Sequence, residues 1–111
     1  MKIENDIKNG VEALIEAAKS DYDRWSGPNR NEHEEEMFAE YCEKIDYKPG
    51  SKYIKILTSG VHSFVVNTDK DKKFNRGDIL KAASWNAPAR NFARGNVLDG
   101  SLENVRWTGV N

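Results

Sequence analysis

Residues 84–96, SWNAPARNFARGN, gather side chains that suit an anionic ligand with a flat ring. The segment holds one Trp, one Phe, three Asn and two Arg in thirteen positions, and it contains no Asp or Glu. An Arg guanidinium stays charged at any biological pH and can donate two parallel hydrogen bonds to a phosphate. An aromatic ring offers a stacking face to a purine, and an Asn amide offers a donor and an acceptor to base edges and ribose hydroxyls. The segment therefore predicts a site for a nucleotide-like anion.

The candidate ligand residues in this half of the chain are polar, cationic or aromatic. Arg106, which stands beside Trp107 in VRWTG, is placed to contribute from a neighbouring strand. Small residues between the candidates, such as Ala87 and Gly95, leave the backbone open to close approach by a ligand. The candidates are Trp85, Asn86, Arg90, Asn91, Phe92, Arg94, Asn96 and Arg106.

A purely structural role for the same side chains is the alternative. Trp85 and Phe92 suit the core of a small barrel, and the Asn residues suit turn caps. Arg90 and Arg94 suit ion pairs with acidic helices, although only five acidic residues follow residue 50. Trp107 is expected in the core whatever the function.

Residues that could carry catalysis or hold a metal are few. His33 stands beside three Glu residues, but no second His or Cys follows at ligand spacing, and Cys42 is expected to face a core. Ser59 and Ser63 lack a visible base and orienting acid, and the sequence has no P-loop and no GxGxxG. We therefore expect a binding protein with no metal and no cofactor. An enzyme that uses His62 as a base is the alternative.

The composition is that of a soluble, globular single domain. The chain has 111 residues, of which 38% are hydrophobic and 32% charged. Its single cysteine excludes an internal disulfide. The first ten residues, MKIENDIKNG, lack the apolar region of a signal peptide, and no apolar run approaches membrane-spanning length. We expect a cytoplasmic protein.

The formal net charge of −1 hides an uneven distribution. Residues 1–50 carry 7 Lys or Arg and 13 Asp or Glu, a net charge of −6. Residues 51–111 carry 10 and 5, a net charge of +5. This split predicts a basic binding face in the second half, with a pair of solvated acidic helices as the alternative explanation.

An amphipathic helix is expected over residues 2–25. Its apolar side chains recur every three or four positions from Ile3 to Trp25, and Ser26-Gly27-Pro28 ends the pattern. Gly10 weakens this helix slightly, because glycine is a poor helix former.

A second helix is expected over residues 31–47. Asn31 and Glu34 fit a capping pattern, and Pro49-Gly50 ends the element. The short connection between the two helices predicts an antiparallel hairpin. The expected buried stripe of this helix is Met37, Phe38, Tyr41, Cys42 and Ile45.

The pattern changes to strands from Ser51 onward. YIKIL and VHSFVV are β-rich runs broken by Ser59-Gly60, and a tight turn with Gly77 at positive φ launches another strand. Two more short strands are expected near 95–98 and 103–108, with the hairpin signal Asp99-Gly100 between them. The fold class is therefore α+β in one domain: an N-terminal antiparallel helical hairpin (1–48), then a small antiparallel β-sheet or partly closed barrel (51–111).

Four runs carry a resemblance to a known family: YIKI, VHSFVV, GDILKAASWNAPARNFARGN and VRWTG. They resemble small proteins of tailed phages, and among these the chain resembles the phage Thoeris anti-defence family. The resemblance covers most of residues 51–110 by motif, and residues 1–48 only by architecture.

The resemblance implies a non-enzymatic trap, or sponge, that acts in the host cell cytoplasm. Such a trap binds a cyclic ADP-ribose isomer, a signal made from NAD by a bacterial defence enzyme, and sequesters it without cleaving it. The resemblance also implies a homo-oligomer with pockets between paired subunits, and sometimes a second site for cyclic oligonucleotides. Arg24, beside Trp25 at such an interface, becomes a further candidate ligand residue.

Three other functions remain open at this point. A basic β half with aromatic side chains suits a module that binds single-stranded nucleic acid, although the acidic helices would repel phosphate backbones. The acidic helices also suit a phage inhibitor of a host protein, in which they mimic a nucleic acid. A small virion protein without a ligand is the third. Salt dependence separates the first from a small-ligand pocket, since nucleic-acid binding weakens steeply with salt.

Overall fold

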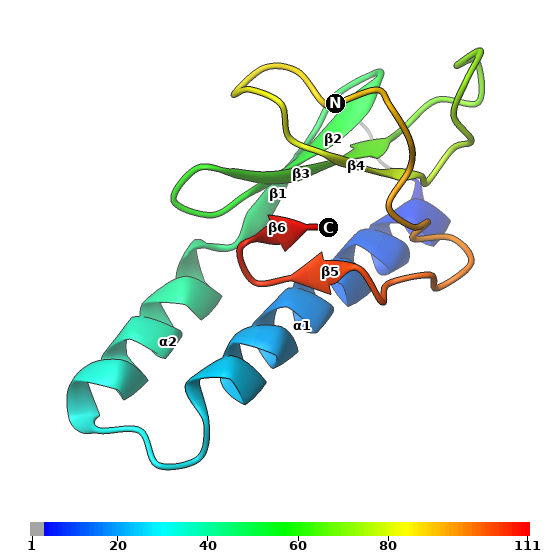
Figure 1. The fold of residues 1–111 in the computed structure, drawn as a ribbon. Helices are drawn as coiled ribbons and strands as arrows, with labels where there is room; N and C mark the ends of the chain where they lie inside the picture. Colours follow the sequence, from blue (N-terminus) through cyan, green and yellow to red (C-terminus); the bar gives the residue numbers. More distant parts are fainter. Residues whose placement is uncertain (1–3) are drawn as a thin grey trace.

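The structure is a computed structural model that describes residues 4–111. In this range two helices precede six strands, and the first four strands form one antiparallel sheet in the order β1-β2-β3-β4 (Figure 1). The predicted α+β class is confirmed, with a small antiparallel sheet that does not close into a barrel over the described residues. The elements are α1 (Asn5–Ser26), α2 (Glu32–Lys44), β1 (Asp46–Pro49), β2 (Tyr53–Leu57), β3 (Val61–Val66), β4 (Ile79–Lys81), β5 (Val105–Arg106) and β6 (Gly109–Val110).

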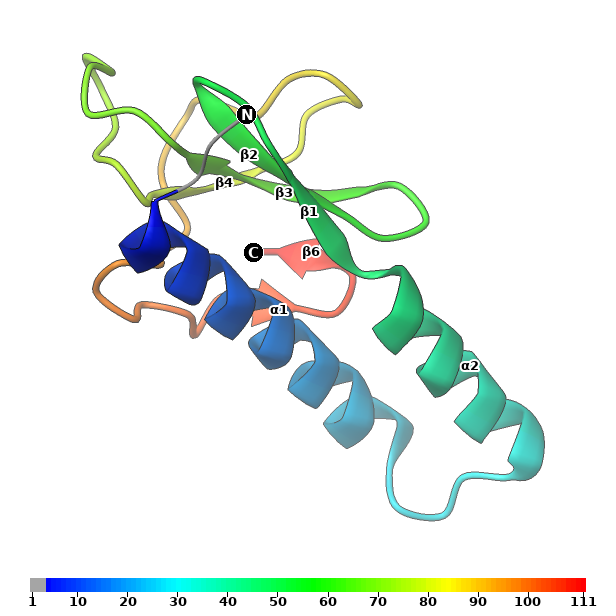
Figure 2. The ribbon, with the colours of Figure 1, turned by 180° about the vertical axis from the view of Figure 1, so that it is seen from behind.

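One hydrophobic core joins α1, the β5–β6 pair and the inner face of the sheet. Figure 2 shows the molecule from the side of α1, and β5 packs against this helix. The apolar stripe of α1 is buried within the chain from Ile7 to Tyr22, whereas Trp25 at its end is 66% exposed. Ile3, where the predicted stripe begins, lies outside the described residues. Most of the stripe is therefore core and not free surface. The core includes Ile7, Val11, Leu14, Ile15, Ala18, Ile54, Ile56, Val65, Ile79, Val105 and Val110.

Gly10 brings the backbone of Val97 close to α1. A Cβ at position 10 would lie 2.5 Å from the carbonyl oxygen of Val97 and 2.9 Å from its Cβ. The glycine that weakens the helix locally therefore permits a tight contact between two distant parts of the chain.

α2 begins as predicted, but its apolar side chains are not fully buried. Asn31 Oδ1 accepts a hydrogen bond from the amide of Glu34 at 2.8 Å, within a complete capping box. No residue of α2 is fully buried; the helix packs on α1, and the Tyr41 hydroxyl donates a hydrogen bond to the carbonyl of Trp107 at 2.7 Å. Of the predicted stripe, only Ile45, which follows the helix, is fully buried. Phe38, Tyr41 and Cys42 are half-buried, with Tyr41 packed against the core, and the prediction is wrong for Met37, which is exposed.

Residues Asp46–Pro49 form an edge strand where the sequence predicted the end of a helix. α2 ends at Lys44, and β1 pairs antiparallel with β2, with Asp46 opposite Leu57. The ladder to β2 overrides the weak local helix signal, and Pro49 is tolerated because β1 lies at the edge of the sheet.

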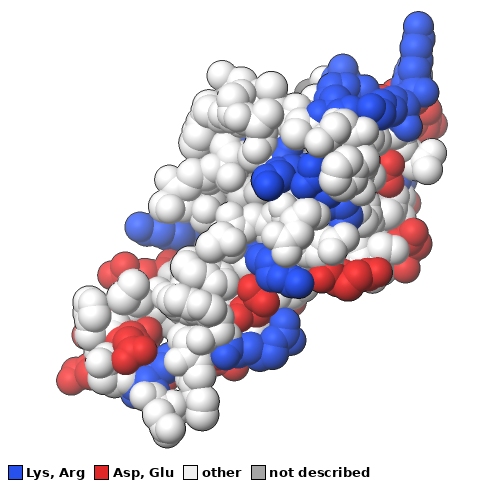
Figure 3. All heavy atoms as spheres, in the orientation of Figure 1, with Lys and Arg blue, Asp and Glu red and all other residues white. Residues whose placement is uncertain are grey.

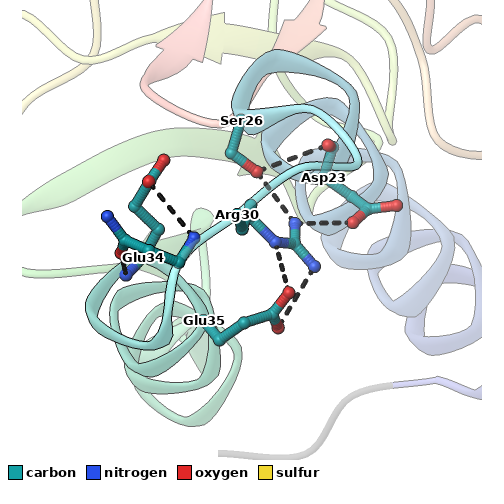
Figure 4. Close-up of polar contacts among 6 residues, drawn as sticks. Asp23, Ser26, Arg30, Glu34 and Glu35 are labelled. Carbon is teal, nitrogen blue, oxygen red and sulfur yellow. Dashed lines mark hydrogen bonds and ion pairs between the residues drawn. The ribbon is translucent and has the colours of Figure 1, made fainter.

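Arg30 fastens the connection between the two helices (Figure 4). Its guanidinium forms ion pairs with Asp23 at 2.7 Å and Glu35 at 2.8 Å, and it donates a hydrogen bond to Ser26 Oγ at 2.8 Å. Its Cζ lies 4.6 Å from the centre of the Phe38 ring. These contacts join the end of α1 to the start of α2, so the two helices run antiparallel but diverge beyond this end (Figures 1 and 2).

The outer face of the sheet, which is the face turned away from the inner core, carries cations and rings. Lys48, Lys55, Phe64 and Leu80 are in register across the four strands on this face. The loops 67–78 and 82–96 cover part of it. They supply Phe74 and Ala93 to a second apolar cluster with Phe64, Val66 and Leu80.

The C-terminal strands differ from the prediction in position. The Asp99-Gly100 turn exists, but it is closed by a single bridge between Asn96 and Ser101, and the paired strands are β5 and β6. The predicted turn before β4 is confirmed, since Gly77 has φ of 93°. No helix in residues 4–111 is long and apolar enough to cross a membrane.

Candidate functional site

An aromatic cavity lies on the outer face of the sheet. It has a volume of about 260 Å³. The rings of Tyr53 and Phe64 meet edge to face, with centres 5.8 Å apart. The ammonium group of Lys55, a lining residue, lies 4.9 Å from the centre of the Trp85 ring. Trp85 therefore stands beside the cavity. The lining residues are Lys48, Pro49, Gly50, Tyr53, Lys55, Phe64 and Asn86.

A second cavity, the lysine cavity, adjoins the first across the β1–β2 turn. It has a volume of about 630 Å³. Gly50 and Tyr53 line the aromatic cavity, whereas the intervening Ser51 and Lys52 line the lysine cavity. Arg90 donates a hydrogen bond from Nη1 to the Tyr53 hydroxyl, which connects the two cavities. The lining residues are Ser51, Lys52, Thr68, Lys70, Asp71, Lys72 and Arg90.

Asp71 positions Arg90 at the boundary between these cavities. The Asp71 carboxylate is 2% exposed, pairs with Arg90 Nη2 at 2.9 Å, and accepts hydrogen bonds from the amides of Lys73 and Phe74 at 2.9 and 3.0 Å. The Arg90 hydrogen bond holds the pKa of Asp71 well below its usual range. Arg90 thus pairs with an acidic residue of the loop 67–78, and the alternative of a pair with the acidic helices is wrong for this residue.

Arg94 is buried and shapes the loop 91–94. It is 6% exposed, and its Cζ lies 4.0 Å from the centre of the Phe92 ring. Its guanidinium donates hydrogen bonds to Asn91 Oδ1 at 3.1 Å and to the Phe92 carbonyl at 3.3 Å. Among residues 4–111, no carboxylate lies within ion-pair distance of Arg94. Arg94 therefore joins Asn91 and Phe92 in one local cluster, away from the walls of the two cavities.

The two aromatic candidates of the segment are not core residues. Trp85 is 58% exposed and Phe92 is 56% exposed. Exposed rings on a loop beside cations are accessible to a ligand. The alternative that Trp85 and Phe92 are core residues is therefore wrong.

Asn96 has a structural role. Its Nδ2 donates to the carbonyl of Arg76 at 3.1 Å and to Asp78 Oδ1 at 2.9 Å, and its Oδ1 accepts from the amide of Leu98 at 2.7 Å. The amide is occupied by the turns on either side of it and lines neither cavity.

Arg24 and Arg106 lie together in a different cavity at the end of α1. This cavity has a volume of about 550 Å³ and shares no residue with the other two. The Trp25 and Trp107 rings lie 4.9 Å apart at its wall. Arg24 approaches Asp21 at 3.6 Å, and Arg106 donates to the carbonyl of Glu103 at 2.9 Å. The structure thus divides the nine predicted residues and places only Asn86 and Arg90 in the walls of the adjoining cavities.

The residues that the sequence prediction missed are mainly lysines. KYIK alternates so that Tyr53 and Lys55 share a face, a period-2 signal that points to one side of a strand. The run KDKK at 70–73 carries three cations in four positions, a charge signal that could have pointed to this cavity. The missed cavity residues are Lys48, Lys52, Tyr53, Lys55, Lys70 and Lys72.

His62, on β3, is buried against β5. Its Nε2 donates to the carbonyl of Arg106 at 2.6 Å, which leaves Nδ1 to accept from the Ser63 hydroxyl at 2.8 Å. His62 is 2% exposed, and burial lowers its pKa. Both ring nitrogens are occupied, so the imidazole is not poised as a base toward a bound ligand. Within residues 4–111 no group of three His, Cys, Asp or Glu side chains is placed to hold a metal ion.

The fold and these cavities define a small α+β protein with a cationic and aromatic sheet face. The sequence model of DUF7717, a family of unknown function, matches residues 1–110, and the chain belongs to this family. No curated protein and no solved structure matches the chain significantly. The family description names no activity, so a proposal on function depends on the site itself.

Proposed function

We propose that this protein binds a phosphate-bearing nucleotide on the outer face of its sheet and holds it without cleaving it. The ligand class is a cyclic ADP-ribose-type signal, and the role is sequestration of that signal in the host cell cytoplasm as a phage anti-defence protein. One observation carries the proposal: an aromatic cavity and a cationic cavity meet at the Arg90–Tyr53 hydrogen bond. The anti-defence role is supported by the resemblance of the four sequence runs.

The parts of such a ligand match the parts of this face. A purine can stack on Tyr53 or Trp85, and the Asn86 amide offers a donor and an acceptor to a base edge. The cations beside Arg90 complement phosphates. The lysine cavity, of about 630 Å³, is of the size that small ligands occupy, and the aromatic cavity adds about 260 Å³ beside it.

A trap of this kind needs tight binding, on the order of nanomolar, which is about −12 kcal/mol. An open sheet face leaves one side of the ligand exposed to water. A second copy of the chain over this face would enclose the ligand and bury more of its surface, so we propose that the binding form is a homo-oligomer.

Mass spectrometry of the released ligand tests the proposal directly. The protein is incubated with lysate from cells in which an NAD-dependent defence has been triggered, then washed and heat-denatured. Release of an intact cyclic ADP-ribose species is expected. No release, with the lysate signal undiminished, would refute sequestration, and a hydrolysed product would identify an enzyme.

Substitution of two exposed tryptophans, one at a time, tests where on the protein the ligand binds. Trp85→Ala removes the ring beside the aromatic cavity and should lower retention about tenfold or more, since base stacking contributes roughly 1–3 kcal/mol. Trp25→Ala removes a ring of similar exposure at the end of α1 and should leave retention unchanged. The reverse result would move the ligand to the cavity of Arg24 and Arg106.

Binding of single-stranded nucleic acid is the second candidate function. It is favoured by the row of Lys48 and Lys55 beside exposed Trp85 on an open sheet face. Affinity for an oligonucleotide that falls steeply between 50 and 200 mM salt would support it. A buried small ligand should show much weaker salt dependence.

A further inference from the structure

We propose that the lysine cavity is a diphosphate subsite, which binds two linked phosphates while the aromatic cavity takes the ring of the same ligand. The orientation of the whole ligand rests on the proposed function. The binding of a diphosphate group by the cavity is an independent property and can be tested alone.

The cavity presents uncompensated positive charge. Lys52, Lys70 and Lys72 are exposed, and in the described part of the chain none of them forms an ion pair. The carboxylate among the lining residues belongs to Asp71, which is 2% exposed and already bound by Arg90. The accessible charged groups on the wall are therefore cationic. Figure 3 shows Lys and Arg side chains gathered at the upper right, over the loop between β3 and β4, while acidic side chains lie over α2 at the lower left.

Hydrogen bonds hold the two walls of the cavity in place. Asn67 donates from Nδ2 to the carbonyl of Gly50 and from its backbone amide to the carbonyl of Lys52, both at 2.8 Å. Two hydrogen bonds from backbone amides to side chains hold the opposite wall. The Lys70 amide donates to Thr68 Oγ1 at 3.1 Å, and the Lys73 amide donates to Asp71 Oδ1. The lysine stems therefore start from fixed backbone positions, and only their ends need to be ordered by a ligand.

The number of cations favours a diphosphate over a single phosphate. Three lysines approach from two walls, and Arg90 stands at the side next to Tyr53. Lysine ammonium groups act as point charges on flexible stems, so they can reach oxygens on two neighbouring phosphates. A diphosphate placed here leaves the next group of the ligand beside Tyr53, at the entrance to the aromatic cavity.

Titration with inorganic pyrophosphate tests the subsite without any nucleotide. Amide chemical shifts and calorimetry are recorded at constant ionic strength, with orthophosphate as the comparison ligand. We expect saturable one-to-one binding of pyrophosphate, shifts confined to residues 50–53, 67–73 and 90, and affinity at least tenfold above that of orthophosphate.

Two double variants of equal charge locate the effect. Lys70→Ala with Lys72→Ala should weaken pyrophosphate binding at least tenfold. Lys8→Ala with Lys44→Ala removes the same charge from exposed positions on the helices and should leave the affinity unchanged. Equal loss in both pairs, or no binding of pyrophosphate to the unaltered protein, would overturn the subsite.

The same titrations separate this inference from the proposed function. Pyrophosphate binding without retention of any nucleotide would keep the subsite and refute the sequestration of a nucleotide. Retention of cyclic ADP-ribose that is insensitive to the Lys70 and Lys72 substitutions would keep the function and refute the placement of the ligand's diphosphate in the lysine cavity.

Discussion

Arg90 donates a hydrogen bond from Nη1 to the hydroxyl oxygen of Tyr53, and this contact joins the loop 82–96 to strand β2. The other side of the same guanidinium pairs with Asp71 in the loop 67–78. One side chain thus connects two loops and a strand at the boundary between the aromatic and lysine cavities. The geometry of both cavities depends on this junction.

Tyr53→Phe tests the junction, because it removes the hydroxyl and keeps the ring. Arg90 retains Asp71, so the fold should persist, while affinity for a cyclic ADP-ribose isomer should fall about three- to tenfold in calorimetry. Tyr47→Phe on the neighbouring strand is the control, since the Tyr47 hydroxyl makes no hydrogen bond within residues 4–111. Unchanged affinity in Tyr53→Phe would mean that the junction does not shape the site.

Arg94→Ala should act on the fold before it acts on binding. The substitution removes two hydrogen bonds of a buried guanidinium and its contact with the Phe92 ring, so the free energy of unfolding should fall by about 1–3 kcal/mol. Urea unfolding measures this loss. Arg24→Ala, whose side chain is 73% exposed, is the comparison and should change stability by less than about 0.5 kcal/mol. An Arg94→Ala protein of full stability would refute the structural role.

Gly10→Ala should destabilise the protein, against the usual helix preference. An exposed Gly to Ala change inside a helix normally stabilises by up to about 1 kcal/mol. At this position the new Cβ would lie 2.5 Å from the carbonyl oxygen of Val97, so we expect a loss of about 1–3 kcal/mol in thermal or urea unfolding. Gly60→Ala, with no atom within 4 Å of its added Cβ, should be nearly neutral. A stabilised Gly10→Ala protein would contradict the close approach.

His62 should make stability fall as the pH drops below about 6.5. Burial lowers the pKa of His62 in the folded chain below its usual value of about 6.5, so the unfolded chain binds the proton more readily. Stability from this residue is therefore fully present above about pH 6.5 and is lost as the pH falls toward the folded pKa. Unfolding midpoints measured at pH 7.5 and 5.5 should differ in the native chain and much less in His62→Gln.

His33→Gln provides the control for this measurement, because the chain has two His residues and His33 is exposed. The pH dependence should survive that substitution. If His62→Gln keeps the full difference between pH 7.5 and 5.5, the buried imidazole is not its source.

The elements with strong local patterns were predictable from the sequence. The apolar stripe of α1 has a clear helical period, VHSFVV and YIKIL are β-rich runs, and Gly77 is the residue that a turn with positive φ requires. In each of these the local signal and the tertiary structure agree.

The elements that depend on distant partners were not predictable in the same way. β1 exists because it pairs with β2, and four residues that end in Pro49 give little strand signal by themselves. The spacing of Met37 and Tyr41 is helical, but spacing does not reveal what covers a helix, and little covers α2. The lysine cavity depends on the bond from Asn67 to Gly50, which joins positions 17 residues apart. The run KDKK shows the charge, but only the fold shows that it faces Lys52.

The placement of charge along the chain also affects how quickly a ligand is captured. The described part of the molecule is elongated, 47 × 25 × 25 Å, with acidic side chains over α2 and cations over the loop between β3 and β4 (Figure 3). This separation of charge gives the molecule an electric dipole moment although its net charge is only −1. In dilute salt an approaching anion would turn the molecule so that the basic end leads, which raises the association rate constant and leaves the dissociation rate constant nearly unaffected.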